Sequence, residues 1–252
     1  MKRFRNTIIL SMLLALTLCV GAQATENTML KVGLKYGSDA LFTARLQNYN
    51  DTLSGSGYEF GYYDADRSFV PLAVTDEQKI TVTVDSNAYV SGGVCYETRP
   101  TNYSTILGAY HIELLTAFGS YEEALAVAQS YPKGFVAYID GAYRVRVGNH
   151  ASYDESARVL SETDVLAYGA QIVTPSSTGV VVSVTDTDTV LFEFDCSGLR
   201  SLGVRPRSVS GEKTVTWFSG YRYYGGFEYQ RVSGGNINVI NVVDLEDYVK
   251  CV

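Results

Sequence analysis

Hydrophobic and polar residues alternate along much of the chain, and this pattern predicts a protein built mainly from β-strands. Within residues 25–98, strand-like runs occur at 31–36, 58–63 and 79–84. In the last run Ile80, Val82 and Val84 alternate with polar residues, as in a strand with one buried face. Clusters of Gly and Ser separate the runs and indicate turns. We therefore expect a β-rich N-terminal module over residues 25–98.

The hydrophobic period changes over residues 99–184, where an approximate internal repeat occurs. The Gly-Ala-Tyr at Gly108 recurs at Gly141, and the Ser-Tyr-acidic pattern at Ser120 recurs at Ser152. Each half predicts a strand, a helix with Ser as N-cap and acidic residues in its first turn, and a second strand. The predicted strands are 112–117, 135–140, 143–148 and 180–184. The segment thus predicts a βαββαβ unit, an antiparallel sheet with two helices on one face.

Residues 185–252 are again β-rich and end where a helix begins. A strand over residues 238–243 is followed by Asp244 at an N-cap position and by acidic residues in the next turn. Few residues follow Asp244, so we interpret this part as an incomplete domain with an unpaired strand edge beyond about residue 185. The predicted fold class is α+β, with a β-rich module, a βαββαβ domain and an incomplete β-rich domain.

Two motifs in this last part resemble a known family. The run Ile-Asn-Val-Val-Asp-Leu-Glu-Asp-Tyr-Val-Lys, residues 240–250, is similar to the strand-to-helix entry of the stage II sporulation protein D and amidase-enhancer family. The run Tyr-Tyr-Gly-Gly-Phe-Glu-Tyr, residues 223–229, resembles that family's Tyr-Arg-Gly-x-Leu-Glu hairpin, with Tyr224 in place of Arg.

The resemblance implies a lytic transglycosylase or an enhancer of a cell-wall amidase. In that family the helix entry leads into Gly-Val-Val-Pro-x-Glu-Met, whose Glu is the proposed acid/base for cleaving glycan strands. Cys251 stands where that Gly belongs, and the Glu would follow Val252. Glu246 and Asp247 are better explained as carboxylates at a helix N-terminus. We therefore assign no catalytic residue and expect this chain to bind without cutting.

The middle segment resembles a SPOR domain, the peptidoglycan-binding module of many cell-envelope proteins. Residues 117–124 match its aromatic-Ser-x-x-x-Glu-Ala pattern, and residues 143–148 match its Arg-Val-x-Val-Gly pattern. Residues 114–116 depart from the family's usual first strand. The resemblance implies that the open face of the sheet, opposite the helices, binds peptidoglycan glycan strands.

Strand alternation predicts which side chains lie on that open face. Val145 and Val147 should face the helices, as should Ile112 and Leu114, and their neighbours should face away. The candidate glycan-binding residues are His111, Glu113, Tyr138, Arg144 and Arg146. The alternative is that these are ordinary residues of an exposed strand face, without a ligand.

The first 24 residues have the order of a secretory signal peptide. Lys2, Arg3 and Arg5 precede an apolar run at 8–20, and Ala-Gln-Ala follows at 22–24. Cleavage after residue 24 would deliver the protein to the cell wall or the forespore intermembrane space, without a permanent membrane span. A retained membrane anchor is the alternative, although the apolar run is short for a bilayer.

Charge and cysteine content exclude several classes of partner. The chain has a formal charge of −7, and removing residues 1–24 leaves 17 basic against 27 acidic residues, or −10. This acidity argues against nucleic acid and anionic lipid as partners. Cys95, Cys196 and Cys251 form neither a disulfide framework nor a zinc motif, and with only His111 and His150 we expect no metal and no cofactor.

The sequence therefore predicts a secreted cell-wall protein that binds peptidoglycan glycan strands, with a cell-wall amidase as a possible further partner. The alternative is a noncatalytic β-rich adhesin or scaffold that binds another protein through its Tyr-rich strands. An aromatic cluster near the C-terminus could stack on sugars or form a cross-strand ladder that holds a hairpin: Tyr221, Tyr223, Tyr224, Phe227 and Tyr229.

Overall fold

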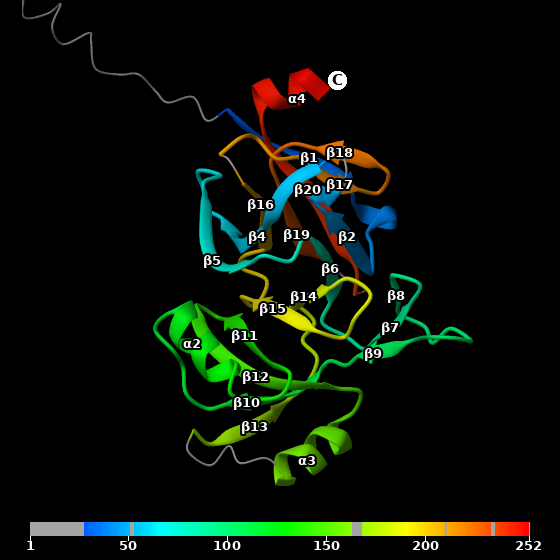
Figure 1. Cartoon of the computed structure of the whole chain (residues 1–252), viewed down its shortest axis with the longest axis vertical. Helices are drawn as coiled ribbons and strands as arrows, with labels where there is room; N and C mark the ends of the chain where they lie inside the picture. The colour runs from blue at the N-terminus through cyan, green and yellow to red at the C-terminus, as the bar shows by residue number, and fades with distance from the viewer. Residues whose placement is uncertain (1–27, 51–52, 163–167, 210, 233–234, 252) are drawn as a thin grey trace, which may run out of the picture.

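The chain is β-rich and forms two large sheets and a small one (Figure 1). The computed structural model describes residues 28–50, 53–162, 168–209, 211–232 and 235–251. The predicted signal peptide at 1–24 lies outside these residues. Among the helices in the described ranges, none is long and apolar enough to cross a lipid bilayer.

The first sheet has seven strands and combines the beginning of the described chain with its end. Its order is β1 (Met29–Lys35), β20 (Ile237–Asp244), β19 (Gly226–Arg231), β16 (Leu202–Ser208), β4 (Leu53–Tyr63) and β3 (Tyr49–Asn50), and β5 (Phe69–Thr75) also pairs with β4. Met29 lies opposite Asp244, and Phe60 of β4 lies opposite Val204 of β16. The predicted separation of residues 25–98 and 185–252 into two modules is therefore wrong.

The C-terminal strand also differs from the prediction, because its edges are paired. Strand β20 is hydrogen-bonded to β1 on one side and to β19 on the other. No local sequence pattern reveals that the partner strand β1 lies more than 200 residues earlier in the chain, so the sequence alone predicts an unpaired edge. Residues 239–242 of β20 are thus paired on both sides.

The second sheet has ten strands and runs through all three predicted parts. Its order is β13 (Ala170–Val173), β10 (Tyr110–Leu114), β12 (Ala142–His150), β11 (Gly134–Ile139), β15 (Val190–Asp195), β14 (Val180–Val184), β6 (Lys79–Val84), β2 (Thr43–Gln47), β17 (Thr216–Phe218) and β18 (Tyr221–Tyr223). The pairing of β11 with β15 is parallel, and the other pairings in this sheet are antiparallel. A three-stranded sheet of β8 (Val94–Tyr96), β7 (Ala88–Ser91) and β9 (Thr105–Leu107) lies beside it.

Two helices pack on the part of this sheet formed by residues 110–173. Helix α2 (Tyr121–Ala128) contacts β11 and β12, and α3 (Tyr153–Glu162) contacts β10, β12 and β13. The predicted last strand of this unit, 180–184, instead pairs with β6 and β15. Its place beside β10 is taken by β13, a short strand that the sequence analysis did not identify. A short 3₁₀ turn (Gly37–Asp39) and helix α4 (Leu245–Cys251) are the other described helical elements.

Both helices of this unit begin as the internal repeat predicts. The hydroxyl of Ser120 accepts a hydrogen bond from the N–H of Glu123 at 3.2 Å, and the Glu123 carboxylate accepts one from the N–H of Gly119 at 3.2 Å. This arrangement is a variant of the capping box, in which the carboxylate accepts from the N–H of the residue before the N-cap, and it satisfies two backbone donors at the helix start. The second helix repeats it with Ser152, Glu155 and Ala151.

The hydrophobic core lies between the two large sheets and extends under α2. Phe60 of β4 stacks on Phe192 of β15 at 5.6 Å between ring centroids, which joins one sheet to the other. Ala124 and Ala128 of α2 are buried in the same cluster. A smaller core under the three-stranded sheet contains Ala88, Val90, Cys95, Leu107 and Val181. The apolar faces that strand alternation predicts are therefore buried against one another.

Candidate functional site

Four of the five predicted glycan-binding residues lie on one face of the ten-stranded sheet. Glu113 is opposite Arg146 on the neighbouring strand, and Arg144 is two residues away on the same strand. His111 is two residues from Glu113 on β10, so it points to the same side. We call these residues together with Glu193 of β15 the polar face. Strand alternation on β10 and β12 is sufficient to place the four predicted residues on this face.

Tyr138 does not belong to the polar face. It is opposite Tyr143 in the pairing of β11 with β12, whereas its neighbour Ala137 is opposite Arg144. The Tyr138 ring stacks on Phe194 at 6.0 Å and is part of the main core. The prediction was wrong because Tyr was treated as polar and Ala as core-facing, when here the small Ala leaves room beside the charged side chains.

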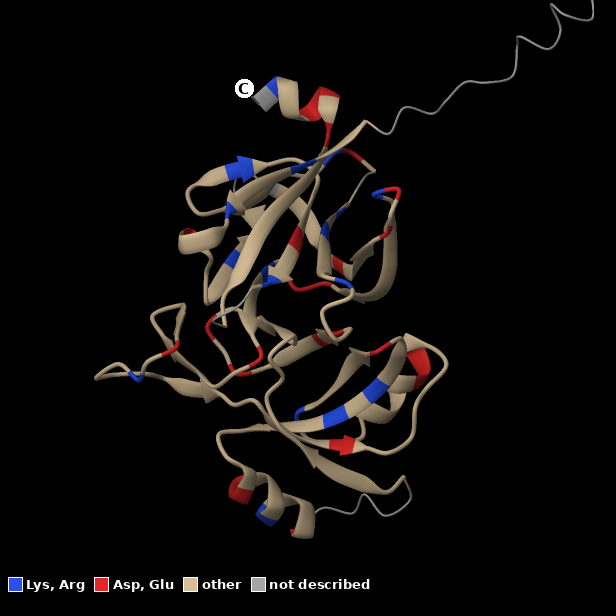
Figure 2. Cartoon of the chain, turned by 180° about the vertical axis from the view of Figure 1, so that it is seen from behind, with Lys and Arg blue, Asp and Glu red and all other residues tan. Residues whose placement is uncertain are grey.

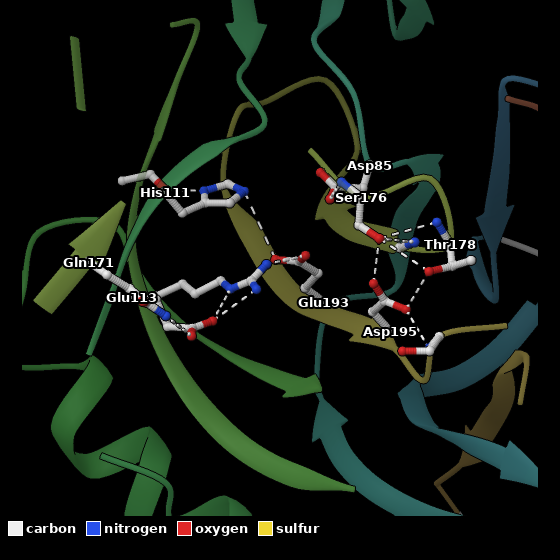
Figure 3. A network of polar contacts seen from close by, with 12 residues as sticks. Asp85, His111, Glu113, Gln171, Ser176, Thr178, Glu193 and Asp195 are labelled. Carbon is white, nitrogen blue, oxygen red and sulfur yellow. Dashed lines mark hydrogen bonds and ion pairs between the residues drawn. The ribbon is translucent and has the colours of Figure 1, made fainter. Parts of the chain in front are cut away.

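The polar face is buried, contrary to the expectation of an open surface. His111 is 1 % exposed, and Glu113 and Arg146 are each 7 % exposed. Arg146 contacts Glu113 through Nε and Nη2, both at 2.9 Å, and contacts Glu193 through Nη1 (Figure 3). Only Arg144 is partly accessible, and its Nη1 donates to the carbonyl of Leu115 at 3.2 Å.

Charge pairing explains why these buried groups are tolerated. Burial by itself would lower the pKa of Arg146, but the carboxylates of Glu193 and Glu113 outweigh it, and the pKa is raised. The guanidinium is therefore a permanent cation between two acids. Gln171 of β13 donates a further hydrogen bond to Glu113 at 3.1 Å. The charged groups of Glu113 and Arg146, which the sequence predicts to bind a glycan, are therefore bonded to other protein side chains instead.

A second polar cluster adjoins the polar face at the ends of β6 and β15 (Figure 3). The carboxylate of Asp85, 3 % exposed, accepts from the N–H of Ser176 at 2.6 Å. Asp195 accepts from the hydroxyl of Thr178 at 2.8 Å and from that of Ser176. Burial, and next the nearby charge of Glu193, hold the pKa of Asp85 well above its usual range. Asp85 therefore keeps its proton to higher pH than an exposed Asp.

These groups do not form a metal centre. Within the described ranges, no set of His, Cys, Asp and Glu side chains has the geometry to hold a metal ion. Cys95 and Cys196 are buried free thiols. Burial raises the pKa of both thiols above the ordinary value, which keeps them protonated and poorly nucleophilic.

An open cleft of about 1070 Å³ lies at the end of the seven-stranded sheet nearest α4. It is lined by residues of both segments that carry the resemblance to the sporulation protein D family, namely Tyr224, Gly225 and Gly226 from one and Val242, Asp244 and Asp247 from the other. Sequence analysis named Asp247 only as a helix-start residue. The meeting of the two motifs at one cleft depends on the pairing of β19 with β20.

The two glycines allow the chain to pass close to neighbouring strands at the cleft wall. Gly225 has φ of +76°, and a Cβ there would overlap the carbonyl oxygen of Val242. A Cβ at Gly226 would overlap the hydroxyl of Tyr63 and approach the carbonyl oxygen of Val204 to 2.8 Å. Larger residues at either position would push apart the strands that form the cleft.

Aromatic and charged side chains alternate along the rest of the cleft wall. The Tyr63 ring meets that of Phe69 edge to face at 5.2 Å, and the Arg205 guanidinium lies 4.6 Å from the centre of the Phe69 ring. Arg205 is also paired with Glu59 at 2.7 Å. These wall residues come from β4, β5 and β16, and no local motif marks them in the sequence.

The acidic groups at the α4 side of the cleft are held by an ion pair and by hydrogen bonds. Lys213 Nζ contacts both oxygens of Asp247 at 2.6 Å, and Asp247 is 7 % exposed. Hydrogen bonds from the hydroxyl of Thr28 and from the N–H of Glu246 lower the pKa of Asp244. Carboxylates stabilised as anions accept hydrogen bonds well but are poor proton donors. The described cleft residues are therefore suited to binding.

The aromatic cluster of residues 221–229 is mainly structural. The Tyr223 ring contacts Phe227 at 6.0 Å, Phe227 contacts Phe218 at 5.9 Å, and Tyr229 is fully buried. Tyr221 is 70 % exposed and Tyr224 lines the cleft. The ladder interpretation holds for the inner rings, while Tyr224 remains available to a ligand.

Comparison with known protein families, with curated proteins and with solved structures finds no match to this chain.

Proposed function

We propose that this protein binds peptidoglycan glycan strands, and that the cleft beside α4 is the binding site. One observation carries the proposal: the two segments that resemble the sporulation protein D family both line this cleft. The resemblance suggests the glycan, and the cleft offers the space. The chain would act outside the cell, at the wall.

The chemistry of the cleft suits an uncharged or zwitterionic polymer. Tyr224 offers an aromatic face on which a sugar ring can stack, and Arg67, Asp66 and Glu212 add polar groups of both signs. Basic and acidic residues are interspersed along the chain and not gathered into one basic or one acidic region (Figure 2). Such a mixture favours hydrogen bonding to hydroxyl and N-acetyl groups over attraction to a uniformly charged polyanion.

We also propose that residues 110–173 form a SPOR-like unit. The element order β10, α2, β11, β12, α3 and β13, with the strand order β13-β10-β12-β11, supports this proposal. The burial of His111, Glu113 and Arg146 argues against glycan binding on the polar face of this unit. For that reason the cleft, and not the polar face, is the proposed glycan site.

The test is co-sedimentation of the chain from residue 25 onward with purified sacculi, before and after an amidase removes the stem peptides. Tyr224→Ala should weaken binding about tenfold, equivalent to about 1.4 kcal/mol, because it removes an aromatic face. The backbone carbonyl of residue 224 still accepts the hydrogen bond from the Asn241 side chain, so the local fold is kept. Tyr221→Ala, on the same hairpin and exposed to solvent, is the matched control and should bind like the wild type.

A further variant separates the two glycan hypotheses. Arg144→Ala alters the accessible residue of the polar face and should leave binding unchanged. Loss of binding in Arg144→Ala with normal binding in Tyr224→Ala would move the site to the polar face. If the folded wild type stays in the supernatant with both preparations of sacculi, glycan binding is refuted and the protein-binding scaffold becomes the leading hypothesis.

A further inference from the structure

His111 is held in one tautomer by its contact with the backbone. Its Nδ1 lies 2.6 Å from the carbonyl oxygen of Gly148. A carbonyl oxygen only accepts hydrogen bonds, so Nδ1 must carry the proton. Gly148 has φ of +77°, and a Cβ there would overlap the ring of His150. The backbone conformation that positions this carbonyl is therefore one that glycine supplies readily.

The other ring nitrogen then faces a carboxylate in the same buried region. His111 Nε2 is 3.9 Å from Glu193 Oε2, and the two side chains are 1 % and 0 % exposed (Figure 3). Neither of these two atoms has a hydrogen-bond partner within the described part of the chain. In the neutral ring Nε2 is an acceptor, so two acceptors face each other away from water, which is unfavourable. When Nε2 binds a proton, it becomes a hydrogen-bond donor on a cationic ring, and the Glu193 carboxylate then attracts it.

The two residues come from strands that are not adjacent, and the shape of the sheet brings them together. β12 and β11 lie between β10 and β15 in the sheet order. Arg146 of β12 spans the same interval by contacting Glu113 of β10 and Glu193 of β15. Ala137 of β11, opposite Glu193, leaves space for these longer side chains. The distance from His111 to Glu193 therefore depends on the curvature of the sheet.

The surrounding charges determine how readily the pair binds a proton. Arg146 of β12 contacts both Glu193 and Glu113, and Asp85 after β6 lies near Glu193. The charges of Arg146 and His150 also act on His111. Burial lowers the pKa of His111, and the carboxylate of Glu193 acts in the opposite direction. The ring is thus neutral at pH 7 and accepts its second proton only in more acidic solution.

We propose that His111 and Glu193 form a buried, pH-sensitive latch, in which one proton taken up by Nε2 draws β10 toward β15 across the curved sheet. At neutral pH the two side chains face each other without a bond. On acidification the imidazolium donates from Nε2 to Glu193, and the contact shortens to an ordinary charge-assisted hydrogen bond of about 2.8 Å. The latch changes the local curvature between the two strands.

Nitrogen NMR of the imidazole groups tests the latch in the chain from residue 25 onward. The protein has two histidines, so His150→Gln assigns both sets of signals. We expect the Nδ1–H tautomer of His111 at pH 8, and protonation of Nε2 with a midpoint below the ordinary 6.5. Amide signals of β10 and β15 should shift at the same midpoint. An Nε2–H tautomer at pH 8, or β10 and β15 amide signals that do not move at the His111 midpoint, would overturn the proposal.

Variants of the pair complete the test. Glu193→Gln should lower the His111 midpoint by about one to three pH units, since an opposite charge within about 4 Å is removed. An unchanged midpoint in this variant also refutes the latch. If Glu193→Gln does not fold, His111→Gln is used in its place. The wild type should lose stability as pH falls below 6.5, because His111 is harder to protonate in the folded than in the unfolded protein. The His111→Gln variant should lose less stability over the same pH range. Parallel pH profiles of the two proteins would count against the latch.

Discussion

Replacing Arg146 with Met should destabilise the protein far more than replacing Arg144 with Met. Both residues lie on β12 and point to the same face, but Arg146 is 7 % exposed and makes charged contacts with Glu113 and Glu193. Its removal leaves two buried carboxylates without their cation, which costs about 3–5 kcal/mol. Arg144 is partly exposed and bonds one carbonyl, so its loss should cost about 1 kcal/mol.

Urea unfolding followed by far-UV circular dichroism measures the difference. With a urea dependence of about 2 kcal/mol per molar, the midpoint of Arg146→Met should fall by about 1.5–2.5 M relative to the wild type. Hydrogen exchange should show the largest loss of protection in β10, β12 and β15, the strands that the guanidinium links. Equal midpoints for Arg146→Met and Arg144→Met would refute the view that the polar face is a buried charge network.

Two further predictions concern the cleft and the second polar cluster. Gly226→Ala should lower the free energy of unfolding by about 1–3 kcal/mol and reduce sacculus binding, because the added methyl group meets the Tyr63 hydroxyl. Gly119→Ala is the control and should be nearly neutral, since the nearest neighbour of its added methyl group is 3.5 Å away. Equal effects of the two substitutions in thermal melts would contradict this prediction. Asp85→Asn should gain stability relative to the wild type as pH rises above about 4. The pKa of Asp85 is raised on folding, so its favourable contribution is present below 3.8 and is lost as pH rises through the folded pKa. A constant difference between variant and wild type from pH 4 to 8 in urea titrations would disprove it.

The parts of this fold that depend on nearby residues could be predicted from sequence. The capping boxes at Ser120 and Ser152 need only residues within one turn, and alternation on β10 and β12 assigned Glu113 and Arg146 to one face. Alternation separates the two faces of a strand but does not tell what covers each face. The burial of Arg146 follows from Glu193 on a later strand, which no local pattern connects to it.

The residues of the cleft, too, could be predicted from the sequence only in part. Tyr224 and Asp244 belong to motifs that are visible in the sequence, and the hairpin of the consecutive strands β19 and β20 brings them together. The opposite wall of the cleft depends on long-range pairing of β4 with β16. Tyr63 and Arg205 complete the wall and carry no signal of their own. The predicted domain boundaries were wrong for a related reason, because a β-strand pattern does not identify its partner strand.

The pairing of β1 with β20 has a consequence for how the protein forms during synthesis. Thr28, just before β1, is hydrogen-bonded to Asp244, 216 positions later in the chain. While the ribosome is still making the middle of the chain, β1 has no partner on this side, whereas the helical unit of residues 110–173 can already fold from its own local contacts. The seven-stranded sheet is completed only after β20 leaves the ribosome, so the cleft forms later than the helical unit.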